Sequence, residues 1–130
     1  MVDLRIAITV LCAAGFYVAV AMLRKSLMAE RGELAGPSVV EEPHARLFFG
    51  TPNALWGTLY YPLLVGAAWF APAAPTLRWI AIAAVAAAAA TSLVLAYSLL
   101  FITKRECPYC WTSHVINGLL LFIVPLEVFR

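Results

Sequence analysis

The chain has 130 residues, of which 64% are hydrophobic and 12% are charged. So little polar surface cannot coat a water-soluble globule, and the composition therefore predicts a membrane protein. A formal net charge of +2, without a basic stripe interleaved with aromatic residues, argues against a nucleic-acid partner. The length is that of one domain, so we expect residues 1–130 to form a single unit.

The first apolar segment covers residues 4–23 and ends at Arg24 and Lys25. Its ~20 residues match the length of a membrane-spanning helix. A signal peptide is the alternative, because residues 19–21 read AVA and resemble a small-x-small cleavage site. We expect the segment to be retained as the first spanning helix. Cys12 lies within it and is interpreted as an inert core residue.

Residues 24–51 form the longest polar stretch, in which four glutamates are balanced by four basic residues. Residues 36–38 read GPS and mark a break, after which residues 41–49 predict a short amphipathic helix on the membrane surface. Mixed charge of this kind is typical of a solvated face.

Three further apolar segments cover residues 52–70, 77–102 and 110–128. A proline-containing turn at 71–75 sends the third segment back along the second, and the alanine-rich middle of the third allows close helix packing. The pattern predicts an all-α membrane protein, an antiparallel bundle of four transmembrane helices. Both termini would then share one side of the membrane, and the long loop would lie on the other.

Cys107 and Cys110 form a CPYC motif where a charged loop meets the last apolar segment. Two cysteines at this spacing can close a disulfide or share a metal ion. Pro108 favours a helix start here, because a proline in the first turn loses an N–H group that has no partner anyway. The remaining N–H groups at a helix N-terminus stabilise a thiolate. A dithiol at a membrane surface indicates redox exchange between soluble thiols and a lipid-soluble compound.

Residues 43–57 read PHARLFFGTPNALWG, and CPYC opens the fourth segment. These two stretches resemble the vitamin K epoxide reductase family, and the resemblance covers essentially the whole chain. It implies a quinone-linked membrane thiol oxidoreductase that acts with a thioredoxin-like partner in disulfide formation. The quinone would be of the menaquinone, ubiquinone or phylloquinone type. A dithiol gives up two electrons on closing and a quinone takes up two, so the pairing requires no further cofactor.

The resemblance also implies roles for individual residues. Cys110 would lie next to the quinone, and Cys107 would exchange with the partner thiol. Asn53 and His114 would contact the two quinone carbonyls, with His114 in place of a familiar tyrosine. The apolar pocket positions would be Trp56, Tyr60, Leu95, Leu99 and Tyr109.

Asn53 and His114 also have purely structural explanations. An asparagine before a helix is often an N-cap, and a helical histidine can bond a neighbouring backbone group. The family's second cysteine pair, in the loop after the first helix, has no counterpart, because residues 24–51 contain no cysteine. Gly36 and Glu42 stand where a cysteine and a serine are familiar. A non-catalytic assembly factor that has lost this relay is therefore an alternative function.

A metal-binding membrane module is a second alternative. Cys107, Cys110 and His114 lie at i, i+3 and i+7, on one helical face, and supply three ligands of a tetrahedral site. His44 or Glu106 would have to supply the fourth. The four-ligand set that is typical of structural zinc is incomplete in the sequence.

The side of the membrane on which the cysteine pair lies is argued both ways. The basic residues on the loop side are Arg24, Lys25, Arg31, Arg46, Lys104 and Arg105, and those on the terminal side are Arg5, Arg78 and Arg130. The positive-inside rule alone places the richer loop side in the cytoplasm. The family resemblance implies the exocytoplasmic face, where new disulfides persist. We expect the exocytoplasmic face, because the loop glutamates also dilute the positive field.

Overall fold

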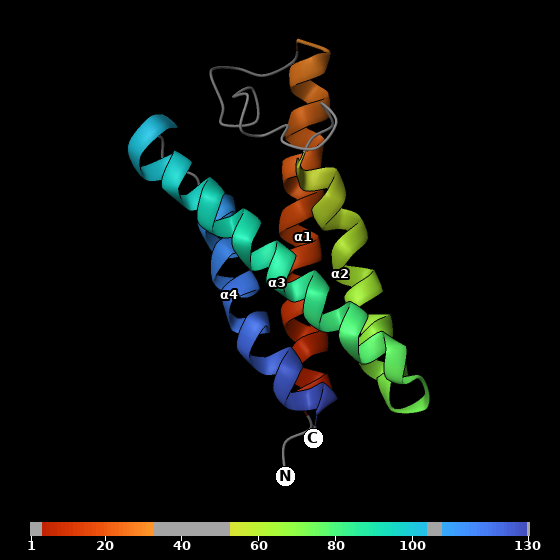
Figure 1. Ribbon diagram of the computed structural model, residues 1–130. Helices are drawn as coiled ribbons and strands as arrows, with labels where there is room; N and C mark the ends of the chain where they lie inside the picture. The colour runs from red at the N-terminus through yellow and green to blue at the C-terminus, as the bar shows by residue number, and fades with distance from the viewer. Residues whose placement is uncertain (1–3, 33–52, 104–107, 130) are drawn as a thin grey trace.

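The structure is a computed structural model that describes residues 4–32, 53–103 and 108–129 (Figure 1). The four long helices are α1 (Leu4–Glu30), α2 (Asn53–Phe70), α3 (Pro75–Tyr97) and α4 (Pro108–Val128). Two short helices accompany α3, namely η3 (Ala71–Ala73) before it and the π-helix η4 (Ser98–Thr103) after it. No strand occurs in the described residues, and the predicted all-α class is confirmed. The expected amphipathic helix at 41–49 lies outside them.

Helix α1 continues seven residues beyond the predicted end at Leu23, to Glu30. The charged residues that close the apolar run do not stop a helix, because lysine, arginine and glutamate are good helix formers. The helix stops at Gly32, which has a φ of 70° and whose N–H bonds the carbonyl of Ala29. A left-handed glycine just after the last turn is a common helix C-terminus, since it carries no Cβ to clash.

Prolines set the other boundaries. Pro75 lies in the first turn of α3, and Pro108 opens α4, two residues before the predicted start. A proline here has its φ already close to the helical value and gives up an N–H that has no partner in the helix. Ala74, between η3 and α3, is extended and reverses the chain within the predicted 71–75 turn.

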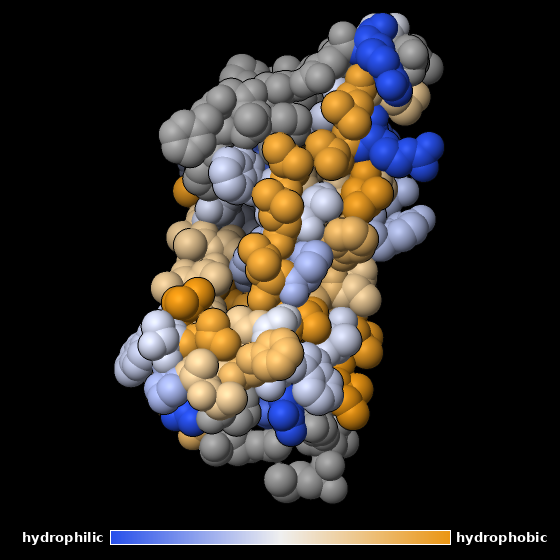
Figure 2. All heavy atoms as spheres, turned by 90° about the vertical axis from the view of Figure 1, so that its right-hand side faces the viewer, coloured by the Kyte–Doolittle hydropathy of each residue, from blue (hydrophilic) through white to orange (hydrophobic). Residues whose placement is uncertain are grey.

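Three of the four helices are long and apolar enough to cross a membrane, at Leu4–Ala29, Pro75–Ile102 and Pro108–Val128. Helix α2 is not among them, because Asn53, two adjacent tyrosines and Pro62 lower its hydropathy. The predicted count of four spans is therefore confirmed for three, and a fourth span at α2 stays a prediction. Hydrophobic side chains cover the middle of the face drawn in Figure 2, with hydrophilic ones near its ends. A surface of this kind suits a hydrocarbon environment.

The helices form a ring in which each packs mainly against two others, α1 and α3 each contacting both α2 and α4. Trp69 of α2 bonds Thr9 near the start of α1, whereas Gly57 of α2 lies against Ala19 further along it. Contacts between these two helices thus run in opposite order along the chain. In Figure 1 the start of α1 and the end of α4 lie at the same end of the molecule.

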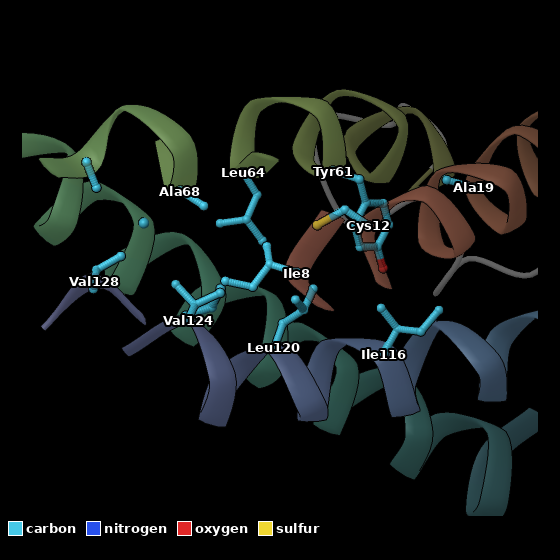
Figure 3. Close-up of a cluster of buried hydrophobic side chains, with 13 residues drawn as sticks. Ile8, Cys12, Ala19, Tyr61, Leu64, Ala68, Ile116, Leu120, Val124 and Val128 are labelled. Carbon is cyan, nitrogen blue, oxygen red and sulfur yellow. The ribbon is translucent and has the colours of Figure 1, made fainter. Parts of the chain in front are cut away.

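The buried core lies where the four long helices meet, and α3 contributes Ala81 and Val85 to it (Figure 3). Ile8, Leu120 and Val124 are almost fully buried, and Figure 3 shows Ile8 beside Leu120. Cys12 is 1% exposed and free, as expected for a small core residue. Tyr61 is the largest fully buried side chain, and it brings a hydroxyl group into this apolar centre.

Candidate functional site at the start of α4

Cys110 lies in the first turn of α4 and is half-buried. The sequence places it there because Pro108 starts the helix two residues earlier. At this position the backbone N–H groups of the first turn have no partner within the helix and their dipoles point toward its start. In the structure the Cys110 sulfur is part of a disulfide, and this surrounding favours negative charge on the sulfur once the disulfide is reduced. Cys107, the other member of the motif, lies outside the described residues.

Tyr109 carries the aromatic ring between the two cysteine positions, and α1 holds it from the side. The ammonium nitrogen of Lys25 lies 5.1 Å from the centre of the Tyr109 ring. A cation at this distance over an aromatic face is attracted by the ring quadrupole. The extension of α1 beyond the predicted end therefore has a consequence for the site, because it places a positive charge next to the start of α4.

His114 lies one helical turn after Cys110 and is half-buried. Its ring is edge-on to Trp111, with the ring centres 5.8 Å apart. Both ring nitrogens are buried, and neither has a hydrogen-bond partner within the described residues. The bond to a neighbouring backbone group, which was the structural explanation for this histidine, is thus not made. Unpaired buried groups are costly, so the position calls for a further explanation.

Asn53, Trp56 and Tyr60 lie on the first two turns of α2. Asn53 is the first residue of the helix and is half-buried, and Trp56 is 40% exposed. Tyr60 is half-buried, and its ring meets the Tyr61 ring edge-on at 4.9 Å. The Tyr60 hydroxyl is buried without a hydrogen-bond partner in the described part of the chain. A position expected to be simply apolar therefore also presents a polar atom.

Leu95 and Leu99 belong to the last turns of α3 and to η4. Leu99 is buried and Leu95 is half-buried. Leu95 and Leu99 are four residues apart, and in an α-helix of 3.6 residues per turn such residues share one face. From Ser98 the chain is a π-helix, in which bonds reach from i to i+5, so the spacing of side chains around the axis changes there. Short π-helical stretches are frequent at functional sites.

Sequence reasoning missed a chain of hydrogen bonds in the middle of the bundle. The Tyr61 hydroxyl of α2 donates to Oδ1 of Asn117 in α4 at 2.8 Å. Nδ2 of Asn117 donates to Oγ of Ser92 in α3 at 2.6 Å. The Ser113 hydroxyl lies 3.2 Å from the Tyr61 oxygen. The signal was present in the sequence, since polar residues at helical spacing within an apolar span usually face the bundle interior.

Gly15 of α1 completes this arrangement. A Cβ placed on Gly15 would lie 2.5 Å from the Tyr61 ring, closer than any real contact. The Tyr61 ring therefore lies directly on the backbone of α1, and only a glycine permits that approach. The ring is held between α1 on one side and the polar groups of α4 on the other.

The metal alternative finds no support within the described ranges, which contain no group of three or more histidine, cysteine or acidic side chains suited to a metal ion. Three of the residues that this alternative invokes, namely His44, Glu106 and Cys107, lie outside those ranges. The alternative therefore stays a hypothesis from the sequence.

An all-helical chain with three helices able to cross a membrane is an integral membrane protein. The model of the vitamin K epoxide reductase family matches residues 6–125, which is nearly the whole chain. The chain belongs to the vitamin K epoxide reductase family. Membership implies a redox function at the membrane and oxidoreductase activity in general.

Proposed function

We propose that this protein couples a Cys107–Cys110 dithiol and disulfide to a lipid-soluble quinone. Family membership supports a membrane redox function. The observation that carries the quinone is His114, whose two ring nitrogens are buried one turn from Cys110 without a partner in the described residues. A buried polar ring beside a reactive cysteine suits a ligand that carries oxygen atoms on an otherwise apolar ring.

The proposed redox step balances without any further reactant. Cys107 and Cys110 lose two electrons and two protons as their sulfurs join. A bound quinone takes up the two electrons and the two protons and becomes a quinol. Cys110, on the helix, is the residue beside the quinone, and Cys107, nearer the loop, exchanges with a partner thiol. The helix N-terminus favours the attacking thiolate, and thiolate fraction and access set the rate of such exchange.

Asn53 and His114 hold the two quinone oxygens in this proposal. An asparagine amide and a histidine N–H each donate a hydrogen bond, and donation to oxygen favours the electron-rich form. Trp56, Tyr60, Leu95, Leu99 and Tyr109 supply the surrounding ring and aliphatic surface. The quinone is of the menaquinone, ubiquinone or phylloquinone type, since each carries two ring oxygens and an apolar body.

The membrane arrangement we propose is an antiparallel bundle of four spans, with α2 as the fourth. The cysteine pair then lies at the exocytoplasmic surface, where a disulfide persists. A thioredoxin-like protein is the proposed partner. Because residues 24–51 contain no cysteine, this partner would exchange directly with Cys107 instead of through a loop pair.

The experiment is quinone reduction by the purified protein in lipid vesicles, with dithiothreitol as the electron donor. We expect turnover of menaquinone by the natural protein and its loss in Cys107→Ser and in Cys110→Ser. Cys12→Ser is the matched control, because Cys12 is a free cysteine in the core. Unchanged turnover in Cys110→Ser would overturn the proposal. Loss of bound zinc in Cys110→Ser would support the metal-binding module. If Cys110→Ser changes neither quinone turnover nor bound zinc, the assembly factor is supported.

A further inference from the structure

Three polar side chains from three helices meet at one point, and we call Tyr61, Asn117 and Ser92 the Asn117 clamp. Asn117 uses both ends of its amide, accepting from Tyr61 at 2.8 Å and donating to Ser92 at 2.6 Å. Because the Tyr61 hydrogen is given to Asn117, the Tyr61 oxygen is the acceptor of the Ser113 hydroxyl at 3.2 Å. The bonds therefore run in one direction from Ser113 to Ser92.

Two of the three clamp side chains are buried within apolar helices, and Asn117 is half-buried. Tyr61 is 2% and Ser92 is 7% exposed. Polar residues inside a membrane span are rare, face the bundle interior and mark functional positions more often than not. Apolar residues at the three clamp positions would fill the same space, and they would bring no polar group that needs a hydrogen-bond partner. The clamp is therefore better explained by the geometry that it fixes than by the stability that it adds.

On each of the three helices, the clamp residue lies one to three positions farther from the cysteine end than a residue proposed to line the quinone site. On α4, Asn117 follows His114 by three residues, a rise of about 4.5 Å away from the cysteine end. On α2, Tyr61 follows Tyr60. Helix α3 runs toward the cysteine end (Figure 1), so Ser92, which precedes Leu95, is also the deeper residue.

We propose that Asn117 is a positioning residue and that its clamp forms the floor of the quinone pocket. This inference rests on the proposed function. By tying α2 and α3 to α4, the clamp sets the width of the pocket and the depth at which the quinone ring stops. The ring is then held level with His114 and Cys110. Tyr61 is suited to a floor because its ring is backed by the bare backbone at Gly15 and cannot move toward α1.

The clamp has no direct role in the redox step, and this makes its role separable. Without the clamp the quinone ring is held less well in the pocket, so KM for quinone rises more than kcat falls. The two thiols still react normally with a soluble disulfide reagent, because that reaction does not require the pocket.

The test compares Asn117→Leu, which removes both bonds at similar volume, with Tyr61→Phe, which removes only the hydroxyl. Thr112→Val is the control, since Thr112 is exposed on α4 and bonds only its own helix, at Pro108. We expect KM for menaquinone to rise about tenfold in each variant, because each change removes two interhelical bonds. The double variant should raise KM by less than the product of the two single effects, because both changes remove the Tyr61–Asn117 bond.

The outcomes separate this inference from the proposed function. If the natural protein fails to reduce quinone, the proposed function is wrong, and the inference is lost with it. If the natural protein turns over and both clamp variants keep its KM, the floor is wrong while the function stands. An equal loss of quinone turnover and of thiol reactivity would also reject the floor, since it would indicate general unfolding. Should Asn117→Leu not fold, Tyr61→Phe decides alone.

Discussion

The two ends of the bundle use their polar side chains differently. At the end opposite the cysteines, Nε of Arg5 pairs with Oε1 of Glu127 at 3.2 Å and the guanidinium lies 4.9 Å from the centre of the Trp69 ring. Trp69 in turn donates to Thr9 at 3.0 Å, and Trp79 meets Phe129 edge-on. Charge and aromatic contacts there join four helices. At the cysteine end, His114 and Tyr60 keep buried polar atoms without partners in the described residues.

Under the proposed function, this difference separates an end that stabilises the fold from an end that binds a ligand. Contacts between α1, α2 and α4 at the Arg5 end lower the energy of the folded chain itself. Unpaired groups at the cysteine end raise it, and under the proposed function the quinone would satisfy them on binding. The Asn117 clamp lies between the two regions. The separation is not complete, because Nε of Arg78, at the Arg5 end, is also buried without a hydrogen-bond partner in the described residues.

The largest expected effect is at the Arg5 end. Glu127→Leu leaves the Arg5 charge in a mostly apolar surrounding, and we expect a loss of about 2 kcal/mol in the free energy of unfolding. This value is below that of a fully buried pair, because the Arg5 side chain is 30% exposed. Thermal unfolding in detergent measures it. The double variant Arg5→Leu, Glu127→Leu should be more stable than Glu127→Leu, and a double variant that is less stable would contradict an ion pair at this end.

The opposite result is expected at the cysteine end. His114→Leu removes two unpaired buried nitrogens, and we expect the ligand-free protein to gain about 1 kcal/mol in the free energy of unfolding. Quinone turnover should fall about tenfold, since a hydrogen bond in a dry site is lost. Thermal unfolding and menaquinone reduction by one preparation test both. A destabilised His114→Leu would show that the histidine serves the fold and would remove the contrast between the ends.

The fold could be predicted largely from the sequence, because hydrophobic length and proline positions act locally. Residues 110–128 were placed within two residues of α4, since Pro108 leaves little choice of where that helix starts. The sequence predicts the end of α1 too early, because the charged residues after Leu23 do not stop the helix. Gly32 stops it. The π-helix at the end of α3 could not be anticipated from a 3.6-residue period.

The candidate site was predictable only where a local motif or the family resemblance named a residue. CPYC and the family likeness predict Cys110, Asn53 and His114 as site residues without any knowledge of packing, and these assignments stay predictions. The Tyr61 hydroxyl and Asn117 lie 56 residues apart, and their contact depends on how α2 and α4 pack. Gly15 is important only because the Tyr61 ring lies on it. Such long-range partners follow from tertiary packing, which spacing within one helix does not determine.

The smallest expected effect concerns the cation–π contact that reaches the cysteine end from α1. Lys25→Ala removes the charge over Tyr109, and an exposed contact of this kind contributes about 0.5 kcal/mol to the free energy of unfolding. Arg24→Ala is the matched control, an exposed basic residue one position earlier on the same helix. A double-mutant cycle with Tyr109→Leu isolates the contact, because the coupling energy counts only what the two side chains share. A coupling near zero would mean that Lys25 and Tyr109 are merely neighbours. A clear coupling would show that the cysteine end, for all its unpaired groups, is held to α1 through the residue that separates the two cysteines.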